Sequence, residues 1–168
     1  AANPNSVEAK LMLLQGFIAV NDVTQATSLA NGLLKTNADS PAVQTVVGSL
    51  ASLKKDDAGA RQAYNRALAA DPRSYQALAG LLNAELKSKN FGAARALIDK
   101  QLSASPNDPS LNLLAAQTYG LLGDAAEMER ALKKTVEADP HSLEAYTMLA
   151  RMYYKQGRLD QARVELEK

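Results

Sequence analysis

The sequence lacks several residue types on which common functions depend. It has no cysteine, no tryptophan, two phenylalanines and one histidine. Without cysteine, the chain can form no disulfide, no thiol nucleophile and no thiolate zinc site. No run of about 18 apolar residues occurs, so we expect no membrane insertion by these residues. The 19 basic and 18 acidic residues are spread along the chain and give a formal net charge of +1. Because no polybasic block stands out, we also expect no nucleic-acid partner.

The candidates for catalysis are few and isolated. His141 follows Pro140 in a polar link, where a lone histidine is far more often a solvated turn residue than a general base. The pair Asp56–Asp57 stands where a helix is expected to start, so helix capping explains it. No glycine run precedes a Lys-Ser or Lys-Thr pair, and no His, Cys and carboxylate cluster has metal-ligand spacing. We therefore predict that the protein is not an enzyme and has no catalytic residue, cofactor or metal.

Proline marks a regular repeat. Pro72, Pro106 and Pro140 are 34 residues apart, and the segment ADPRS at 70–74 returns as ADPHS at 138–142. Dividing the chain at this period needs no gap and gives repeats at 7–40, 41–74, 75–108 and 109–142, with a truncated repeat at 143–168. Residues 1–6 are expected to end a preceding repeat, because they place Pro4 in the same slot. We thus expect one array over 1–168, taken from a longer protein.

Positions within the repeats have consistent chemistry. The seventh position is apolar in every repeat and holds Leu13, Val47, Leu81, Ala115 and Leu149. The twentieth is small in four repeats of five and holds Ala26, Ala60, Ala94, Met128 and Ala162. Between these columns stands a polar break, with the sequences ND, KKD, KN, GD and QGR. Asp, Asn and Gly favour helix caps and turns, and apolar residues recur at spacings of three and four on both sides. Each repeat is therefore expected to hold two amphipathic helices.

A 34-residue helix–turn–helix with these columns resembles the tetratricopeptide repeat (TPR) family. Repeat two matches the family pattern through Gly48, Ala60, Tyr64, Ala67 and Pro72, and repeat five through Tyr146, Leu149, Ala150, Tyr153, Gly157 and Ala162. The resemblance implies an all-α fold, an α-solenoid of antiparallel helix pairs in a right-handed superhelix. The sequence departs from the pattern by lacking the early tryptophan and by placing Met128 at a normally small position. Where the family packs these positions together, Ala116 leaves room for Met128.

The resemblance also implies where a partner binds. In this family the first helix of each repeat lines a concave face, and the ninth position points into it. Here that column holds Gln15, Ser49, Asn83, Gln117 and Arg151, which can hydrogen bond to an extended partner. The full set of concave-groove ligand contacts that we predict is Gln15, Thr45, Ser49, Asn83, Lys87, Leu113, Gln117, Arg151, Tyr154 and Lys155. The alternative is that the column is only the solvated side of the helices.

One known specificity of the family is not expected here. The members that bind chaperone tails use a basic clamp of Lys, Asn and Arg on three successive repeats. The corresponding positions of the first three repeats hold Leu11, Gln15, Val46, Gln76 and Gly80. A free C-terminal carboxylate is therefore a poor candidate for the ligand.

Three functions fit these observations. The first is a non-catalytic protein–protein interaction scaffold that binds a peptide or protein segment in the concave groove. The second is a self-assembling structural scaffold, a homo-oligomer formed through end and edge repeats, because the helix expected at 159–168 should expose Val164 and Leu166. The third is an accessory arm of a larger protein of the envelope or of polysaccharide export. The repeat style is similar to that of long bacterial arrays, which favours the cell envelope or periplasm without excluding the cytoplasm.

Overall fold

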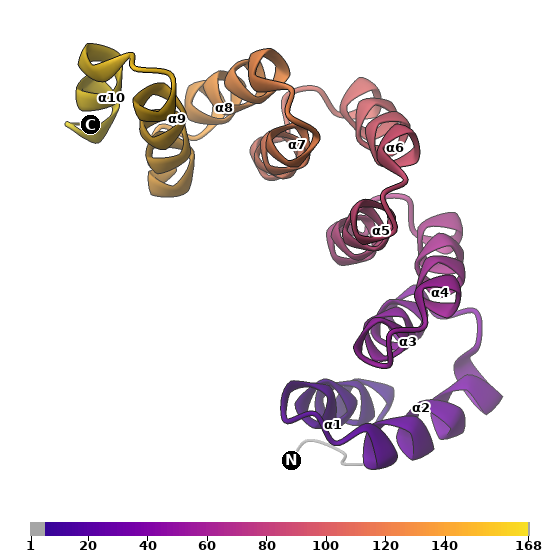
Figure 1. Ribbon diagram of the computed structural model, residues 1–168. Coiled ribbons are helices and arrows are strands. Elements are labelled where there is room, and N and C mark those ends of the chain that lie inside the picture. The colour runs from indigo at the N-terminus through magenta and orange to yellow at the C-terminus, as the bar shows by residue number, and fades with distance from the viewer. Residues whose placement is uncertain (1–5, 168) are drawn as a thin grey trace. The chain divides into compact units, whose positions relative to one another are not determined.

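The computed structural model describes residues 6–167, which form ten α-helices and no strand (Figure 1). The helices are α1 Val7–Ala19, α2 Val23–Asn37, α3 Pro41–Leu53, α4 Asp57–Ala70, α5 Tyr75–Lys87, α6 Phe91–Ala104, α7 Pro109–Leu122, α8 Ala125–Ala138, α9 Leu143–Lys155 and α10 Leu159–Leu166. The prediction of an all-α fold built from helix pairs is confirmed. None of the helices within 6–167 is both long and apolar enough to cross a membrane. Residues 1–5, on which most of the expected preceding repeat falls, lie outside the described residues.

Helix caps set the register of the array. The first helix of every repeat begins at the first residue of that repeat, and the second helix begins at the seventeenth residue. At the N-cap of each of the five first helices, a side-chain oxygen accepts the backbone N–H of the residue three positions later. The capping residues are Ser6, Ser40, Ser74, Asp108 and Ser142. Asp22, Asp56 and Asp124 do the same for α2, α4 and α8. The polar breaks of the sequence therefore act as helix starts, since a capped N-terminus satisfies N–H groups that have no partner inside the helix.

The turn inside each pair uses a left-handed residue at its fifteenth position. The residues with positive φ are Asn21, Lys55 and Lys89, at 59° each, together with Gly123 at 78° and Gly157 at 73°. The following N–H returns to the first helix, as from Asp124 to the Tyr119 carbonyl at 2.9 Å. This is the hydrogen bond of a Schellman-type helix end, which requires a left-handed residue.

The links between repeats contain the proline segments. The Asp71 carboxylate accepts the Arg73 N–H at 3.0 Å, and the Asp139 carboxylate accepts the His141 N–H at 3.1 Å. These are short turns closed by an aspartate side chain, which is a common role for this residue. The exposed His141 therefore belongs to the geometry of its link.

The packing of the helices divides the chain into two compact units, 1–89 and 90–168, here called unit 1 and unit 2. In unit 1, α3 packs directly on α1, α2, α4 and α5, around a core that includes Leu14, Leu33, Val43 and Leu50. In unit 2, α7 and α9 pack on α8 rather than closely on each other, and α6 and α10 pack on α7 and α9. Its fully buried side chains include Ile98, Leu132, Leu149 and Tyr153. The separation of α7 from α9 creates the candidate site.

Candidate binding groove

An open groove lies over α8 in unit 2, between α7 and α9, and is here called the α7–α9 groove. Its volume is about 770 Å³. The residues that line it are Ala116, Gln117, Gly120, Leu121, Ala125, Met128, Met148, Arg151, Met152, Lys155 and Gln156. Figure 1 shows α8 between the two helices that form the walls. Its size is in the range of known ligand pockets, and its lining is mainly apolar with a few polar groups, as such pockets usually are.

Helix periodicity places the lining residues on facing stripes. On α9, Met148, Arg151, Met152 and Lys155 are spaced by three or four residues and therefore share one face. Gln117, Gly120 and Leu121 have the same spacing on α7. The side chain of Leu121 is 70% exposed, so the groove offers apolar surface to a partner.

Small residues on α7 explain why the groove is open above Met128. Ala116 is fully buried and Gly120 has no side chain, so the wall is low on this side. A Cβ atom at Gly120 would lie 3.1 Å from the Met128 Sδ atom, which places the thioether directly against the glycine. Met128 and Ala116 both line this groove, and the residue directly against the Met128 thioether is Gly120.

The charged groups of the groove are cationic. Arg151 and Lys155 are exposed on α9, and neither forms an ion pair with another residue in 6–167. No carboxylate is among the lining residues. At one edge, the Gln117 Nε2 atom donates to the Glu144 Oε1 atom at 2.9 Å, so that carboxylate is engaged with an amide. The groove therefore combines an apolar floor with two cations that have no counter-ion in the described part of the chain.

One polar cluster fixes α9 and its turn onto α8. The Arg158 Nη1 atom lies 2.8 Å from the Glu129 Oε2 atom, and the Lys133 Nζ atom lies 2.7 Å from Oε1. The Tyr153 hydroxyl donates to Oε1 at 3.0 Å, and the Arg158 guanidinium stacks 4.1 Å above the Tyr153 ring. The hydrogen bond from Arg158, followed by that from Lys133, lowers the pKa of Glu129 to about 2.

A related cluster fixes α7 onto α6. The Tyr119 hydroxyl donates to the Asp99 Oδ1 atom at 2.6 Å, and burial together with this bond raises the pKa of Tyr119. The Arg95 Nη1 atom lies 2.7 Å from the Asp124 Oδ2 atom, and its hydrogen bond lowers the pKa of Asp124. Both walls of the α7–α9 groove are thereby held by bonds to charged groups, which are stronger than neutral hydrogen bonds.

Three of the predicted contact residues meet in this groove: Gln117, Arg151 and Lys155. Two others lie on the same helices outside its lining. Tyr154 is 70% exposed on α9, and Leu113 is half-buried on α7. Helices α7 and α9 thus carry five of the ten predicted residues, and the three that face the groove line it.

The remaining five predicted residues belong to unit 1 and differ in accessibility. Gln15, Asn83 and Lys87 are exposed. Thr45 is only 6% exposed, and its hydroxyl donates to the Pro41 carbonyl in its own helix at 2.7 Å. Ser49 is half-buried, and its hydroxyl lies 3.3 Å from the Tyr64 hydroxyl. Because the polar groups of Thr45 and Ser49 are occupied within the fold, we leave these two residues out of the contact set that we propose below.

Several residues that line the groove, most of them apolar, were not predicted from the sequence. Met148, Met152, Gly120 and Gln156 were not among the predicted contacts, and Met128 was noted only as a departure from the repeat pattern. The available signal was that departure, together with the spacing of Met148 and Met152 on the face that carries Arg151. A large flexible residue at a normally small position indicates either tight packing or an open surface, and the small neighbours at 116 and 120 favour the second.

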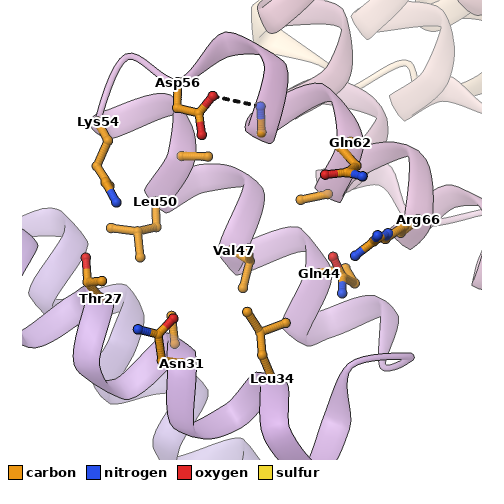
Figure 2. A pocket seen from close by; sticks show the side chains of 14 residues that line it. Thr27, Asn31, Leu34, Gln44, Val47, Leu50, Lys54, Asp56, Gln62 and Arg66 are labelled. Carbon is orange, nitrogen blue, oxygen red and sulfur yellow. Dashed lines mark hydrogen bonds between the residues drawn. The ribbon is translucent and has the colours of Figure 1, made fainter.

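Unit 1 has a smaller cavity of about 270 Å³ between α2, α3 and α4. Figure 2 shows Asn31, Lys54 and Arg66 around Val47 and Leu50. The Asp56 Oδ1 atom accepts the Gly59 N–H at 2.9 Å, so this carboxylate caps α4. Within 6–167, no group of three or more His, Cys, Asp or Glu side chains could hold a metal ion.

Similarity to known proteins agrees with this architecture. Two family models, each described as a tetratricopeptide repeat, match the chain, one over 11–73 and the other over 54–118 and 121–168. No curated protein matches the sequence.

Solved structures of bacterial proteins share the fold at low sequence identity. PilF of Pseudomonas aeruginosa is 15% identical, with a TM-score of 0.76 over 95% of this chain and 73% of its own. TTC0263 of Thermus thermophilus is 21% identical, with a TM-score of 0.71 over 95% and 88%. MamA of Desulfovibrio magneticus is 17% identical, with a TM-score of 0.69 over 94% and 92%. The family models, which match most of the chain, together with the 34-residue period and the capped helix pairs show that the chain belongs to the tetratricopeptide repeat family.

Proposed function

We propose that this protein is a non-catalytic interaction scaffold that binds a segment of a protein partner in the α7–α9 groove. The observation that carries the proposal is the groove itself, an open apolar surface of about 770 Å³ lined by two successive repeats. TPR proteins typically act as protein-interaction scaffolds, and the inner faces of solenoids are their usual binding surfaces. Members of the repeat family are generally non-catalytic, which supports a binding role.

The geometry favours a segment that buries apolar side chains and meets polar groups at the edge. Leu121, Met128 and Met148 offer accessible apolar surface at the centre. Gln117 and Arg151, from the ninth column of the repeats, lie beside them and can hydrogen bond to a partner. An apolar centre with a polar rim is the usual anatomy of a protein interface.

The proposal is tested by selecting peptides from a random display library on the whole chain and measuring their affinity for a variant whose groove is filled. Gly120→Leu adds a side chain to the α7 wall, against the Met128 thioether. We expect this variant to bind the selected peptides at least about tenfold more weakly, because the added side chain occupies the space of the ligand. Fluorescence anisotropy of labelled peptides measures the change.

A matched control is Gly92→Leu in the same unit. Gly92 is exposed on α6, and a Cβ atom there would meet no atom within 4 Å. We expect this variant to bind like the parent chain. Equal affinity of the parent and Gly120→Leu for the selected peptides, with both folded by circular dichroism, would move the binding site away from the groove.

A second candidate function, self-association, is favoured by the surface of α10. Leu159, Val164 and Leu166 on this helix are 59%, 51% and 68% exposed, so three large apolar side chains face outward. Leu159 and Leu166 are seven residues apart and share one face of α10, while Val164 lies on another face, and exposed apolar side chains of this kind are common docking surfaces. We expect the weight-average mass in multi-angle light scattering to rise with concentration, and Val164→Glu with Leu166→Glu to suppress the rise. A constant monomer mass for the parent chain would exclude this function.

A further inference from the structure

We propose that the partner segment of the α7–α9 groove is acidic and amphipathic: an apolar side chain fills the groove, and neighbouring carboxylates meet Arg151 and Lys155. This inference rests on the proposed function and adds the chemistry of the partner to it. Two independent features of the groove carry the inference, namely the composition of its floor and the sign of its charge.

The floor selects for apolar side chains of variable shape. Three of the four methionines in the chain, Met128, Met148 and Met152, line this one groove. Met128 and Met148 are half-buried, while Leu121 beside them is largely exposed. Methionine is flexible and polarisable, so a surface built from it adapts to different apolar side chains. The methionines of the groove therefore favour an apolar side chain of the partner, which can be Leu, Met, Ile or Phe.

The two cationic side chains at the edge of the groove, Arg151 and Lys155, favour a negatively charged partner. Arg151 and Lys155 are one helical turn apart on α9, so their cationic groups lie on the same side of the groove. Several other charged groups of unit 2 are paired, such as Arg95 with Asp124 and Arg158 with Glu129. The two rim cations lack such partners within 6–167, and a carboxylate of the ligand supplies one. Charge complementarity of this kind sets specificity and discriminates strongly against a partner of the same sign.

The test uses two display libraries of helical peptides that randomise the same apolar positions and differ only in their flanking residues, Glu in one and Lys in the other. Both are selected on the whole chain and on the double variant Arg151→Glu, Lys155→Glu. The control variant is Lys100→Glu, Lys134→Glu, which makes the same change of net charge at exposed residues of α6 and α8 outside the groove. A general electrostatic attraction would respond equally to both double variants.

We expect the Glu library to be enriched on the parent and control chains, and the Lys library on the groove variant. The best Glu peptide should bind the groove variant at least about tenfold more weakly than the parent. Carbon-13 labelling of the methionine methyl groups then locates the peptide. The signals of Met128, Met148 and Met152 should shift, while that of Met12, an exposed residue of α1 in unit 1, stays in place.

Other outcomes overturn the inference in distinguishable ways. Equal enrichment of both libraries, with shifts of the three groove methionines, would remove the acidic specificity and leave the proposed function standing. If neither library is enriched although random peptides are selected, the protein binds a segment of a different chemical class, and the inference is overturned. Shifts of the groove methionines with protein concentration alone would identify a second copy of this chain as the occupant. A shift confined to Met12 would contradict both the inference and the proposed function.

Discussion

Units 1 and 2 join their repeats by different chemistry. In unit 1, the buried Tyr64 ring of α4 packs against two glycines, Gly48 of α3 and Gly80 of α5. A Cβ atom would lie 2.6 Å from this ring at Gly48 and 2.4 Å from it at Gly80. In unit 2, Tyr119 and Tyr153 donate their hydroxyls to carboxylates that also bind or neighbour an arginine. Ion pairs between helices brace this unit, as the one from Arg95 on α6 to Asp124 before α8 illustrates.

The difference shows that one fold can be held by shape in one region and by charge in another. Close approach of backbones needs residues without a side chain, and any added atom forces the ring to move. Charged junctions tolerate more variation in shape, since long side chains span the distance between helices. Unit 2 can therefore separate α7 from α9 and keep an open groove, whereas unit 1 packs α1, α3 and α5 directly.

The largest effect is expected from filling the glycine contacts of unit 1. Gly80→Ala should lower the free energy of unfolding by about 2 to 3 kcal/mol, because overpacking against the buried Tyr64 ring exceeds the helix propensity gained by alanine. Urea unfolding followed by circular dichroism measures this. The control is Gly16→Ala on α1, where a Cβ atom meets nothing within 4 Å and stability should rise by about 0.5 to 1 kcal/mol. Equal effects of the two substitutions would refute the shape-based junction.

A second effect breaks the charged junction of unit 2. Glu129→Gln should lower the free energy of unfolding by about 2 kcal/mol at neutral pH, because three donors lose their charged acceptor. Glu137→Gln on the exposed side of α8 serves as the control and should change little. Hydrogen exchange of amides in α8 and α9 measures the loss where it occurs.

The same carboxylate makes the stability of unit 2 depend on pH. The folded pKa of Glu129 is about 2, below its ordinary value of 4.5, so the folded state binds the proton more weakly than the unfolded state. The stabilising contribution is complete above about pH 5 and is lost as the pH falls through 2. Urea midpoints over this range should fall more steeply for the parent chain than for Glu129→Gln, and parallel curves would contradict the ion-pair assignment.

A smaller effect comes from the turns, which also differ between the units. Unit 1 places Asn21, Lys55 and Lys89 in the left-handed conformation, while unit 2 uses Gly123 and Gly157. Lys55→Gly should stabilise the protein by about 1 kcal/mol, because glycine adopts positive φ without a steric penalty. The same substitution one residue earlier, Lys54→Gly, should destabilise it, since the φ there is −75°. Thermal unfolding of the pair decides whether this difference in sign exists.

The smallest effect is expected from introducing into unit 1 an ion pair like the one between Arg95 and Asp124 in unit 2. Thr27 and Asp56 occupy the same repeat positions as Arg95 and Asp124, which form an ion pair. Thr27→Arg should therefore pair with Asp56 across the unit 1 cavity and stabilise unit 1 by about 0.5 kcal/mol. Thr24→Arg, on the exposed face of α2, is the control. A gain that persists in high salt would show that packing rather than charge is responsible.

The fold could be predicted from the sequence because its signals are local. Serine and aspartate caps recur at the helix starts, and every turn places its left-handed residue at the same position, so a period of 34 is visible residue by residue. The all-α architecture follows from these caps and from apolar residues at helical spacing.

The site could be predicted only in part because its shape depends on distances between helices. Gln117, Arg151 and Lys155 lie on the stripes that the repeat pattern selects. Thr45 lies on the corresponding face of α3, yet its hydroxyl donates to the Pro41 carbonyl of its own helix. The repeat pattern does not indicate this hydrogen bond. The methionine floor depends on how far α7 stands from α9, which a one-dimensional pattern does not contain.

The most direct test of the proposed binding site compares units 1 and 2 as binding surfaces. A photoreactive amino acid is placed at Leu121 in the groove or at Met12 on α1, two side chains that are 70% and 73% exposed. Each variant is irradiated with the best library-selected peptide, and the crosslinked product is quantified by mass spectrometry. We predict crosslinking from position 121 that is abolished by Gly120→Leu, and only background from position 12. Equal crosslinking from both positions, or more from position 12, would contradict the assignment of the binding site to the α7–α9 groove.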